Sequence, residues 1–220
     1  MGAPIAAFFD LDHTILTASS GRLFVRYLRQ IRAISRRKEA AIWAWSGLYL
    51  LRLMDYPRLL ARLTVDVAGQ SEAAMWRTCW RWFDEMLVKY ISEDAKRAII
   101  RHRAAGHLVA IVTGSTLYAA GPVAAYLGLG DHVLATRLEV QDGHFTGRLI
   151  EPACYGKGKV YWAERYAAAR GIDLSQSYFY TDSVSDLPLL ERVGHPVAVN
   201  PDWQLRHIAR TRGWPIIAFR

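Results

Sequence analysis

Cysteine is scarce in this chain: only Cys79 and Cys154 occur among its 220 residues. Two thiols are too few for the disulfide framework of a small secreted domain, and nothing around them forms a metal-ligand pattern. The N-terminus also lacks the positive region that precedes the apolar run of a signal peptide. We therefore expect a protein of a reducing compartment, the cytoplasm.

Long hydrophobic runs are lacking too. The most apolar stretch, residues 40–51, is broken by Arg52 and is shorter than the roughly 20 residues of a membrane-spanning helix. We expect a buried helix there, with a helix lying at a membrane interface as the weaker alternative. Hydrophobic residues still make up 52% of the chain, enough for the core of one sizeable domain, with or without an insertion.

Acidic residues are outnumbered, 20 against 28 lysines and arginines, which gives a formal net charge of +8. Such a chain attracts anions: phosphate esters, nucleic acids or acidic lipids. No nucleic-acid-binding motif is present, so we expect no nucleic-acid partner. The densest basic run, residues 29–38, is typical of a solvated helix end. The less favoured alternative is a patch that, with the Trp-rich segment after it, contacts a membrane.

Helix and strand patterns alternate along most of the chain. They predict an α/β fold with a Rossmann-like, doubly wound parallel sheet, interrupted by a purely helical, Trp-rich block. The predicted helices cover residues 22–33, 38–53, 57–67, 72–90, 93–105, 117–127, 159–170, 187–193 and 203–210. The predicted strands cover residues 5–9, 108–112, 133–135, 138–140, 145–149, 178–181, 197–199 and 216–218, with Asp142-Gly143 as a hairpin turn.

Polar residues follow three of these strands where each strand ends. Asp10 and Asp12 follow the first, Thr113 follows residues 108–112, and Asp182 follows residues 178–181. Ligands of an open parallel sheet bind beyond the carboxyl ends of its strands. These side chains are therefore expected to share one pocket.

The pair Asp10 and Asp12 suits phosphoryl transfer. One carboxylate can attack phosphorus and form an acyl phosphate, while the other donates a proton to the leaving oxygen and later takes one from water. A lone Asp-x-Asp more often caps a turn or a helix. Here a second acidic pair, Asp182 and Asp186, supplies the hard oxygen ligands that Mg²⁺ prefers.

Two further signals point to a phosphate site, although each is weak alone. The hydroxyl of Thr113 and the backbone N–H groups near it, that of Gly114 included, can bind phosphate oxygens at a helix start. Lys157 and Lys159 lie in a Gly-rich turn, where a lysine can neutralise a nucleophile and a phosphate. Without the carboxylates, a helix cap and two surface lysines would be the favoured interpretation.

Taken in order and spacing, these motifs resemble the haloacid dehalogenase superfamily of phosphohydrolases, from about Ile5 to the end of the chain. Residues 10–14, DLDHT, match the D-x-D-x-T/V signature. Thr113, a following lysine, and the final pair Asp182 and Asp186 match the remaining motifs.

The resemblance implies a role for each residue. Asp10 would be the nucleophile and Asp12 the general acid/base, while Asp10, Asp182 and the backbone carbonyl of Asp12 would bind Mg²⁺. Asp186 would hold these magnesium ligands in position. The resemblance favours Lys159 over Lys157, because the lysine of phosphoserine-phosphatase-like members opens a helix that ends at a glycine, here Gly171. Lys157 would be an extra basic contact.

The same resemblance divides the chain into a core, residues 1–16 and 91–220, and an inserted helical cap, residues 17–90. Such a cap closes over the pocket and excludes water. His13 stands where Gly or Ser is common. No acid lies in residues 17–22, where phosphoserine phosphatases carry a glutamate that binds the substrate's amino group. Phosphoserine is therefore disfavoured, and a branch with some members associated with histidinol phosphate is closer.

The function expected is thus that of a Mg²⁺-dependent phosphomonoesterase acting on a small-molecule phosphate ester through a phospho-aspartate at Asp10. A phosphotransferase or mutase would use the same aspartate but pass the phosphoryl group to another hydroxyl. A module that binds membranes or anions through the basic run is the third alternative, and the intact acids argue against it.

Overall fold

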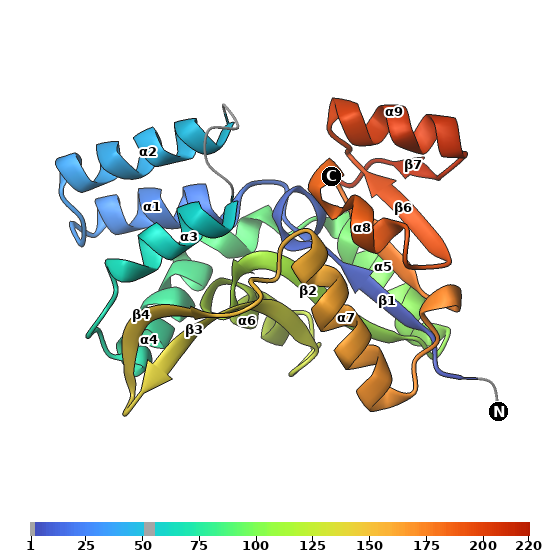
Figure 1. Ribbon diagram of the computed structural model, residues 1–220, viewed down its shortest axis with the longest axis horizontal. Coiled ribbons are helices and arrows are strands. Elements are labelled where there is room, and N and C mark those ends of the chain that lie inside the picture. Colours follow the sequence, from blue (N-terminus) through green and yellow to red (C-terminus); the bar gives the residue numbers. More distant parts are fainter. Residues whose placement is uncertain (1–2, 51–55) are drawn as a thin grey trace.

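A computed structural model describes residues 3–50 and 56–220. Within these residues seven strands form one sheet in the order β4-β3-β2-β1-β5-β6-β7 (Figure 1). All neighbouring strands are parallel except β3 and β4, which form an antiparallel hairpin at one edge. The strands are β1 (Ala6–Phe9), β2 (Leu108–Thr116), β3 (Val133–Gln141), β4 (His144–Ile150), β5 (Tyr178–Thr181), β6 (His195–Val199) and β7 (Ile216–Ile217).

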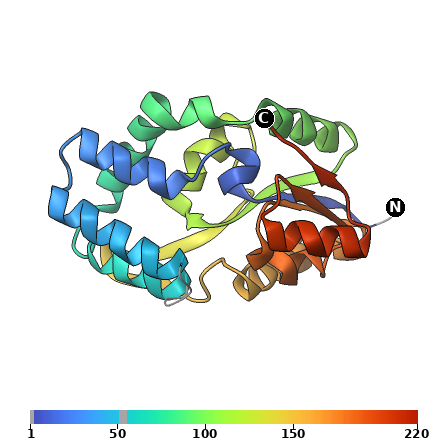
Figure 2. The same cartoon turned by 90° about the horizontal axis from the view of Figure 1, so that it is seen from above.

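Helices cover the sheet on both faces, which confirms the doubly wound α/β fold. Figure 2 shows α5 (green) and α9 (red) on opposite sides of it. The helices are α1 (Ser20–Gln30), α2 (Arg36–Leu50), α3 (Tyr56–Val65), α4 (Glu72–Trp82), α5 (Glu93–Ala104), α6 (Leu117–Tyr126), α7 (Lys157–Arg170), α8 (Leu187–Leu190) and α9 (Trp203–Arg212). The last three residues of the predicted helix 38–53 lie outside the described residues.

Two apolar cores hold these layers together, one on each face of the sheet. In β1, Ala7 and Phe9 belong to the core under α5 and α6, whereas Ala6 and Phe8 belong to the core under α7 and α9. All four side chains are fully buried. A strand buried on both faces shows a continuous apolar run, and successive side chains alternate between the two cores.

The hairpin turn forms where it was predicted. Asp142 and Gly143 have φ angles of 51° and 75°. A two-residue turn of this kind needs positive φ at both positions, which glycine adopts freely and aspartate tolerates.

Several elements differ from the prediction. Strand β2 continues past the predicted end at Val112 to Thr116, so Thr113 and Gly114 lie within a strand and not at a helix start. The helix predicted over residues 72–90 keeps α-helical geometry only to Trp82, and wider and tighter turns follow over residues 83–90. Those turns end at Tyr90, whose carbonyl accepts a hydrogen bond from Thr17 N–H, 2.8 Å away, so the helix cannot continue. The strands predicted over 133–135 and 138–140 are one strand, because the hydroxyl of buried Thr136 is satisfied by Gly114 O at 2.9 Å.

Helices α1 to α4 gather beyond the carboxyl ends of β2 and β3, at the left of Figure 1. Helix α3 packs on β4, and α4 packs on α6. No helix among residues 3–50 and 56–220 is long and apolar enough to cross a membrane.

Candidate active site

The three strand ends that carry the predicted site are adjacent in the sheet. Strand β1 lies between β2 and β5, with Phe9 beside Ile111 on one side and Tyr180 on the other. The backbone N–H of Asp10 continues this ladder by donating to Tyr180 O at 2.8 Å. Asp10 is therefore fixed at the centre of the carboxyl edge, between Thr113 of β2 and Asp182 after β5.

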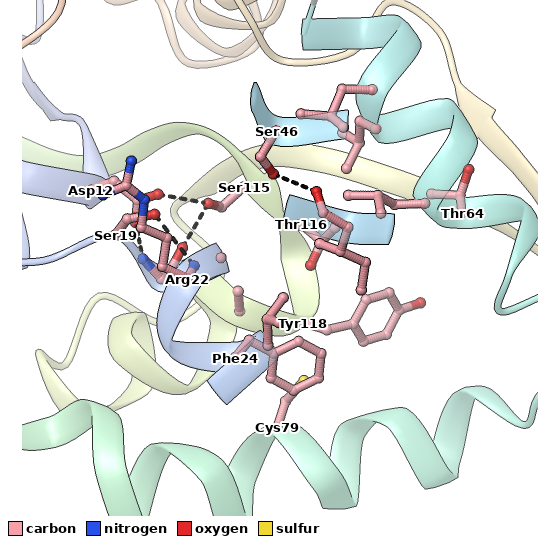
Figure 3. Close-up of a pocket in the computed structure, with 18 of the residues that line it drawn as sticks. Asp12, Ser19, Arg22, Phe24, Ser46, Thr64, Cys79, Ser115, Thr116 and Tyr118 are labelled. Carbon is pink, nitrogen blue, oxygen red and sulfur yellow. Dashed lines mark hydrogen bonds between the residues drawn. The ribbon is translucent and has the colours of Figure 1, made fainter. Parts of the chain in front are cut away.

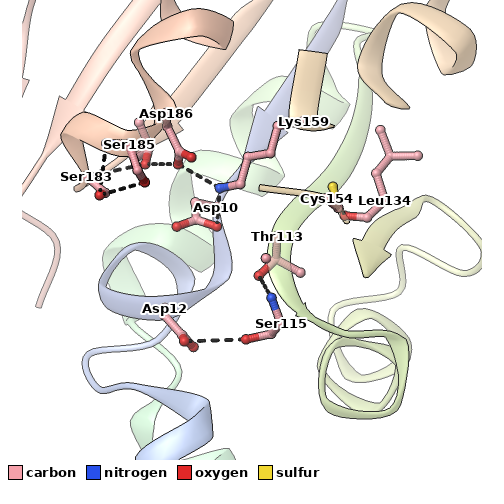
Figure 4. Close-up of polar contacts among 12 residues, drawn as sticks. Asp10, Asp12, Thr113, Ser115, Leu134, Cys154, Lys159, Ser183, Ser185 and Asp186 are labelled. Carbon is pink, nitrogen blue, oxygen red and sulfur yellow. Dashed lines mark hydrogen bonds and ion pairs between the residues drawn. The ribbon is translucent and has the colours of Figure 1, made fainter. Parts of the chain in front are cut away.

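The turn after β1 directs Asp12 toward α1. Asp12 keeps an extended backbone, and His13 then adopts a φ of 56°. A positive φ favours glycine, so a glycine would fit the place of His13 without strain. The carboxylate of Asp12 accepts hydrogen bonds from Ser20 N–H at 2.9 Å and from the Ser115 hydroxyl at 3.4 Å (Figure 4). It is thus held between α1 and β2.

Lys159 joins two of the site's carboxylates. Its Nζ donates to Asp10 Oδ1 at 2.8 Å and to Asp186 Oδ2 at 2.6 Å (Figure 4). The hydroxyl of Thr181 donates to the same Asp186 oxygen at 2.6 Å. The Lys159 side chain is only 3% exposed, whereas Lys157 is exposed. A buried amine is stabilised only by such partners, so Lys159 and the two aspartates form one unit.

Burial shapes the electrostatics of this cluster. It raises the pKa of Asp10 to about 7, against the opposing effect of Lys159. It raises the pKa of Asp182 to about 8, helped by the charges of Asp10 and Asp186. Burial alone would lower the pKa of Lys159, but the carboxylates of Asp10 and Asp186 raise it above its usual value. Three carboxyl groups thus lie near one lysine, and a further cation beside them would favour their charged forms.

Thr113 and Gly114 lie on β2 beside Asp10. The buried Thr113 hydroxyl accepts a hydrogen bond from Ser115 N–H at 3.1 Å, which leaves its own proton for donation. The carbonyl of Gly114 accepts hydrogen bonds from the Tyr56 hydroxyl at 3.2 Å and from Thr136. The strand is therefore held rigidly where it passes the site.

Sequence reasoning missed the two serines that hold Asp12. Ser115 lies two residues after Thr113, but β2 is irregular between Thr113 and Thr116, so strand alternation did not indicate its direction. The hydroxyls of Ser115 and Ser20 also lie 2.9 Å apart. Ser20 reaches the site because α1 turns back over it, and no local pattern indicates that. Asp202 was missed as well; it accepts from Val184 N–H at 2.8 Å and anchors the turn that carries Asp186.

A magnesium ion fits these residues. No group of three or more His, Cys, Asp or Glu side chains is arranged as a metal site in the part of the chain that the structure describes. Mg²⁺ does not require one, because proteins usually bind it through one or two carboxylates, and it keeps several waters. Asp10 and Asp182 provide two acids with raised pKa values. In addition, the buried Oδ1 of Asp186 has no hydrogen-bond partner in the protein.

Comparison with known proteins places the chain in a family. The family model of haloacid dehalogenase-like hydrolases matches residues 7–191. A solved structure of a protein of unknown function from Bordetella pertussis has the same fold, with a TM-score of 0.89 and 31% identity, over 98% of this chain and 99% of that one.

Three curated relatives extend the match to nearly the whole chain. A probable phosphatase of Mycobacterium tuberculosis is 36% identical over 99% of this chain and 76% of its own length. A phosphoserine phosphatase of the same organism is 33% identical over 98% and 71%. A histidinol-phosphatase of Neisseria meningitidis is 29% identical over 97% and 98%. The chain belongs to the haloacid dehalogenase-like hydrolases and is similar, within them, to phosphoserine phosphatases.

Proposed function

We propose that the protein is a Mg²⁺-dependent phosphomonoesterase that hydrolyses a small-molecule phosphate ester through a phospho-aspartate on Asp10. The observation that carries the proposal is the buried contact of 2.8 Å between Asp10 and Lys159 at the carboxyl end of the central strand. It provides a carboxylate nucleophile with a cation beside it, at the edge of the sheet where ligands bind.

In the first step a carboxylate oxygen of Asp10 attacks phosphorus, and the bond from phosphorus to the ester oxygen breaks. Asp12 gives its proton to that leaving oxygen. Burial raises the pKa of Asp12 above the usual carboxyl value, which favours a protonated carboxyl group before the attack. Asp12 then takes a proton from water as the water attacks phosphorus. Asp10 is released as a carboxylate, and the phosphoryl group leaves as inorganic phosphate.

The other residues hold the phosphate and its charge. Lys159 neutralises negative charge on Asp10 and on the phosphoryl oxygens, while the Thr113 hydroxyl and the Gly114 N–H bind those oxygens. Mg²⁺ would be held by the carboxylates of Asp10 and Asp182 and by the backbone carbonyl of Asp12, with Asp186 supporting that shell. When bound, it would offset phosphate charge and fix the phosphate's orientation.

Helices α1 to α4 have the role of a cap in this proposal, as residues 17–90 inserted into a core of residues 1–16 and 91–220. The hydrogen bond from Ser20 of α1 to Asp12 supports it, because it couples the position of the helices to the acid/base. Closing them over the site would exclude water during phosphoryl transfer. The proposed location is the cytoplasm, and the proposed partner is a small-molecule phosphate ester.

A metal-dependence experiment tests this function. We expect the purified protein to release phosphate from a panel of phosphate monoesters in Mg²⁺, to lose that activity in a chelator, and to regain it when Mg²⁺ is added back. Colorimetric phosphate release is the measurement, with a nitrophenyl phosphate as the generic substrate. Release that persists after complete chelation would contradict the magnesium role. If the substrate is consumed only when an acceptor alcohol is added, and the phosphoryl group is found on that alcohol as a new ester, the protein is a phosphotransferase.

A further inference from the structure

A cavity of about 370 Å³ opens beside Asp12, within the size range of small-ligand sites (Figure 3). Asp12 and Ser115 line one end of it. Helices α1 to α4 provide most of the remaining wall, together with the start of α6 and Leu138 of β3. Asp10, Lys159 and Asp182, which surround the proposed phosphate position, do not line it.

The position of the cavity identifies the part of the substrate that it receives. Asp12 is the proposed proton donor to the leaving oxygen, so the alcohol part of the ester lies on the Asp12 side of phosphorus. The cavity lies on that side as well. It is therefore the site for the substrate's organic body, and its lining decides which body fits.

That lining is predominantly apolar. Buried or half-buried aliphatic side chains form much of it, contributed by Ile42, Leu59, Leu60, Leu63 and Val67. Burying each methylene of a ligand against such a wall favours binding, whereas burying an unpaired polar or charged group opposes it.

The described part of this wall offers a cationic body no free carboxylate. Among the described residues that line the cavity, Asp12 is the one acid, and its oxygens already accept hydrogen bonds from Ser20 and Ser115. The nearby carboxylate of Glu72 accepts the Tyr118 hydroxyl at 2.8 Å and does not line the cavity. Among the described lining residues, the basic side chains that an anionic body would meet are Arg22 and His13, both exposed to solvent and therefore weak partners.

We infer that the substrate is a phosphomonoester of an alcohol with an uncharged, apolar body of several carbons, alkyl or aromatic. This inference rests on the proposed phosphatase function and specifies its substrate class. It separates the protein from enzymes whose substrates carry an ammonium group next to the phosphate.

A series of matched esters tests the inference. We expect kcat/KM to rise from ethyl to hexyl phosphate by about 3- to 4-fold for each added methylene, the usual effect of burying one. Propyl phosphate and aminoethyl phosphate have the same number of heavy atoms in the body and differ in charge. We expect propyl phosphate to be preferred by at least about 10-fold, because the cation loses its water without gaining a carboxylate partner.

Variants on one helix locate the effect. Leu63 is half-buried and lines the cavity, whereas Val65 is 64% exposed and does not. Leu63→Trp fills the cavity, so it should reduce the ratio of kcat/KM for hexyl phosphate over ethyl phosphate. Val65→Trp adds the same ring to α3 outside the cavity and should leave that ratio unchanged.

The possible outcomes distinguish a wrong substrate class from a wrong phosphatase function. Mg²⁺-dependent release with no dependence on chain length, or with a preference for aminoethyl phosphate or phosphoserine, would overturn the substrate class and leave the phosphatase function intact. The same length dependence in Leu63→Trp would place the apolar contact elsewhere and overturn the assignment of the cavity. Release from no ester, nitrophenyl phosphate included, would overturn the function and the inference together.

Discussion

The variant Asp10→Asn is expected to lose turnover, with kcat lower by at least about 10⁴-fold, while its fold persists. An amide has the shape of the carboxyl group but does not attack phosphorus. Burial raises the pKa of Asp10, so the site disfavours a charge there, and in this variant Lys159 keeps the Asp186 carboxylate as its partner. Packing and the contact with Lys159 should therefore survive. Phosphate release under saturating nitrophenyl phosphate is the measurement, with a thermal melt as the check on folding.

The matched control is Asp142→Asn, the same change at an exposed hairpin position with a φ of 51°. Asparagine adopts that conformation readily, so activity and stability should stay at the wild-type level. Because asparagine can deamidate back to aspartate, intact mass must show that the Asp10→Asn sample is homogeneous. Activity within tenfold of wild type in such a sample would exclude Asp10 as the nucleophile.

Lys159→Gln is expected to damage both stability and catalysis. Lys159 is the shared partner of Asp10 and Asp186, and removing one member of a buried ion pair typically costs about 3–5 kcal/mol. For a chain of this size, that loss lowers Tm by about 6–20 °C. Without the cation, charge on the phosphoryl oxygens is also less well neutralised, so kcat should fall by about 10²- to 10³-fold.

Lys157→Gln provides the control for that change. Lys157 lies two residues earlier on the same helix and is exposed, so its removal should change Tm by less than about 1 °C and kcat by less than about twofold. Activity is compared at a temperature well below both melting points, so that unfolding does not enter the rate. A Lys159→Gln protein with a lower Tm and wild-type kcat would limit Lys159 to a structural role.

The central part of the site was predictable because its residues come directly after apolar runs in the sequence. Asp10 and Asp182 each follow a strand, and Thr113 follows the apolar run of β2, which is visible in the sequence; parallel strands place such residues at one edge of the sheet. The strand order, with β1 between β2 and β5, then makes them neighbours. Sequence alone did not set this order, but right-handed crossovers in a doubly wound sheet allow few others.

The rest of the site depends on contacts between distant segments, which no local pattern encodes. Ser20 and Ser115 hold Asp12 from elements 95 residues apart along the chain. The cavity is closed by helices of the inserted block against Leu138 of the hairpin. The prediction also interrupted one strand at Thr136 and Arg137, although threonine is favourable in strands. The sheet accommodates them because Thr136 is buried and bonded to Gly114, while Arg137 is exposed.

The covalent phospho-aspartate on Asp10 is tested most directly by trapping it in Asp12→Asn. A nitrophenyl leaving group needs little protonation, so attack by Asp10 should proceed, whereas water attack lacks its base. We predict a burst of about one nitrophenol per chain with little phosphate release. After acid quenching, the phosphoryl group should be on the peptide that contains Asp10. No burst and no labelled peptide, or a phosphoryl group on another residue, would contradict this account.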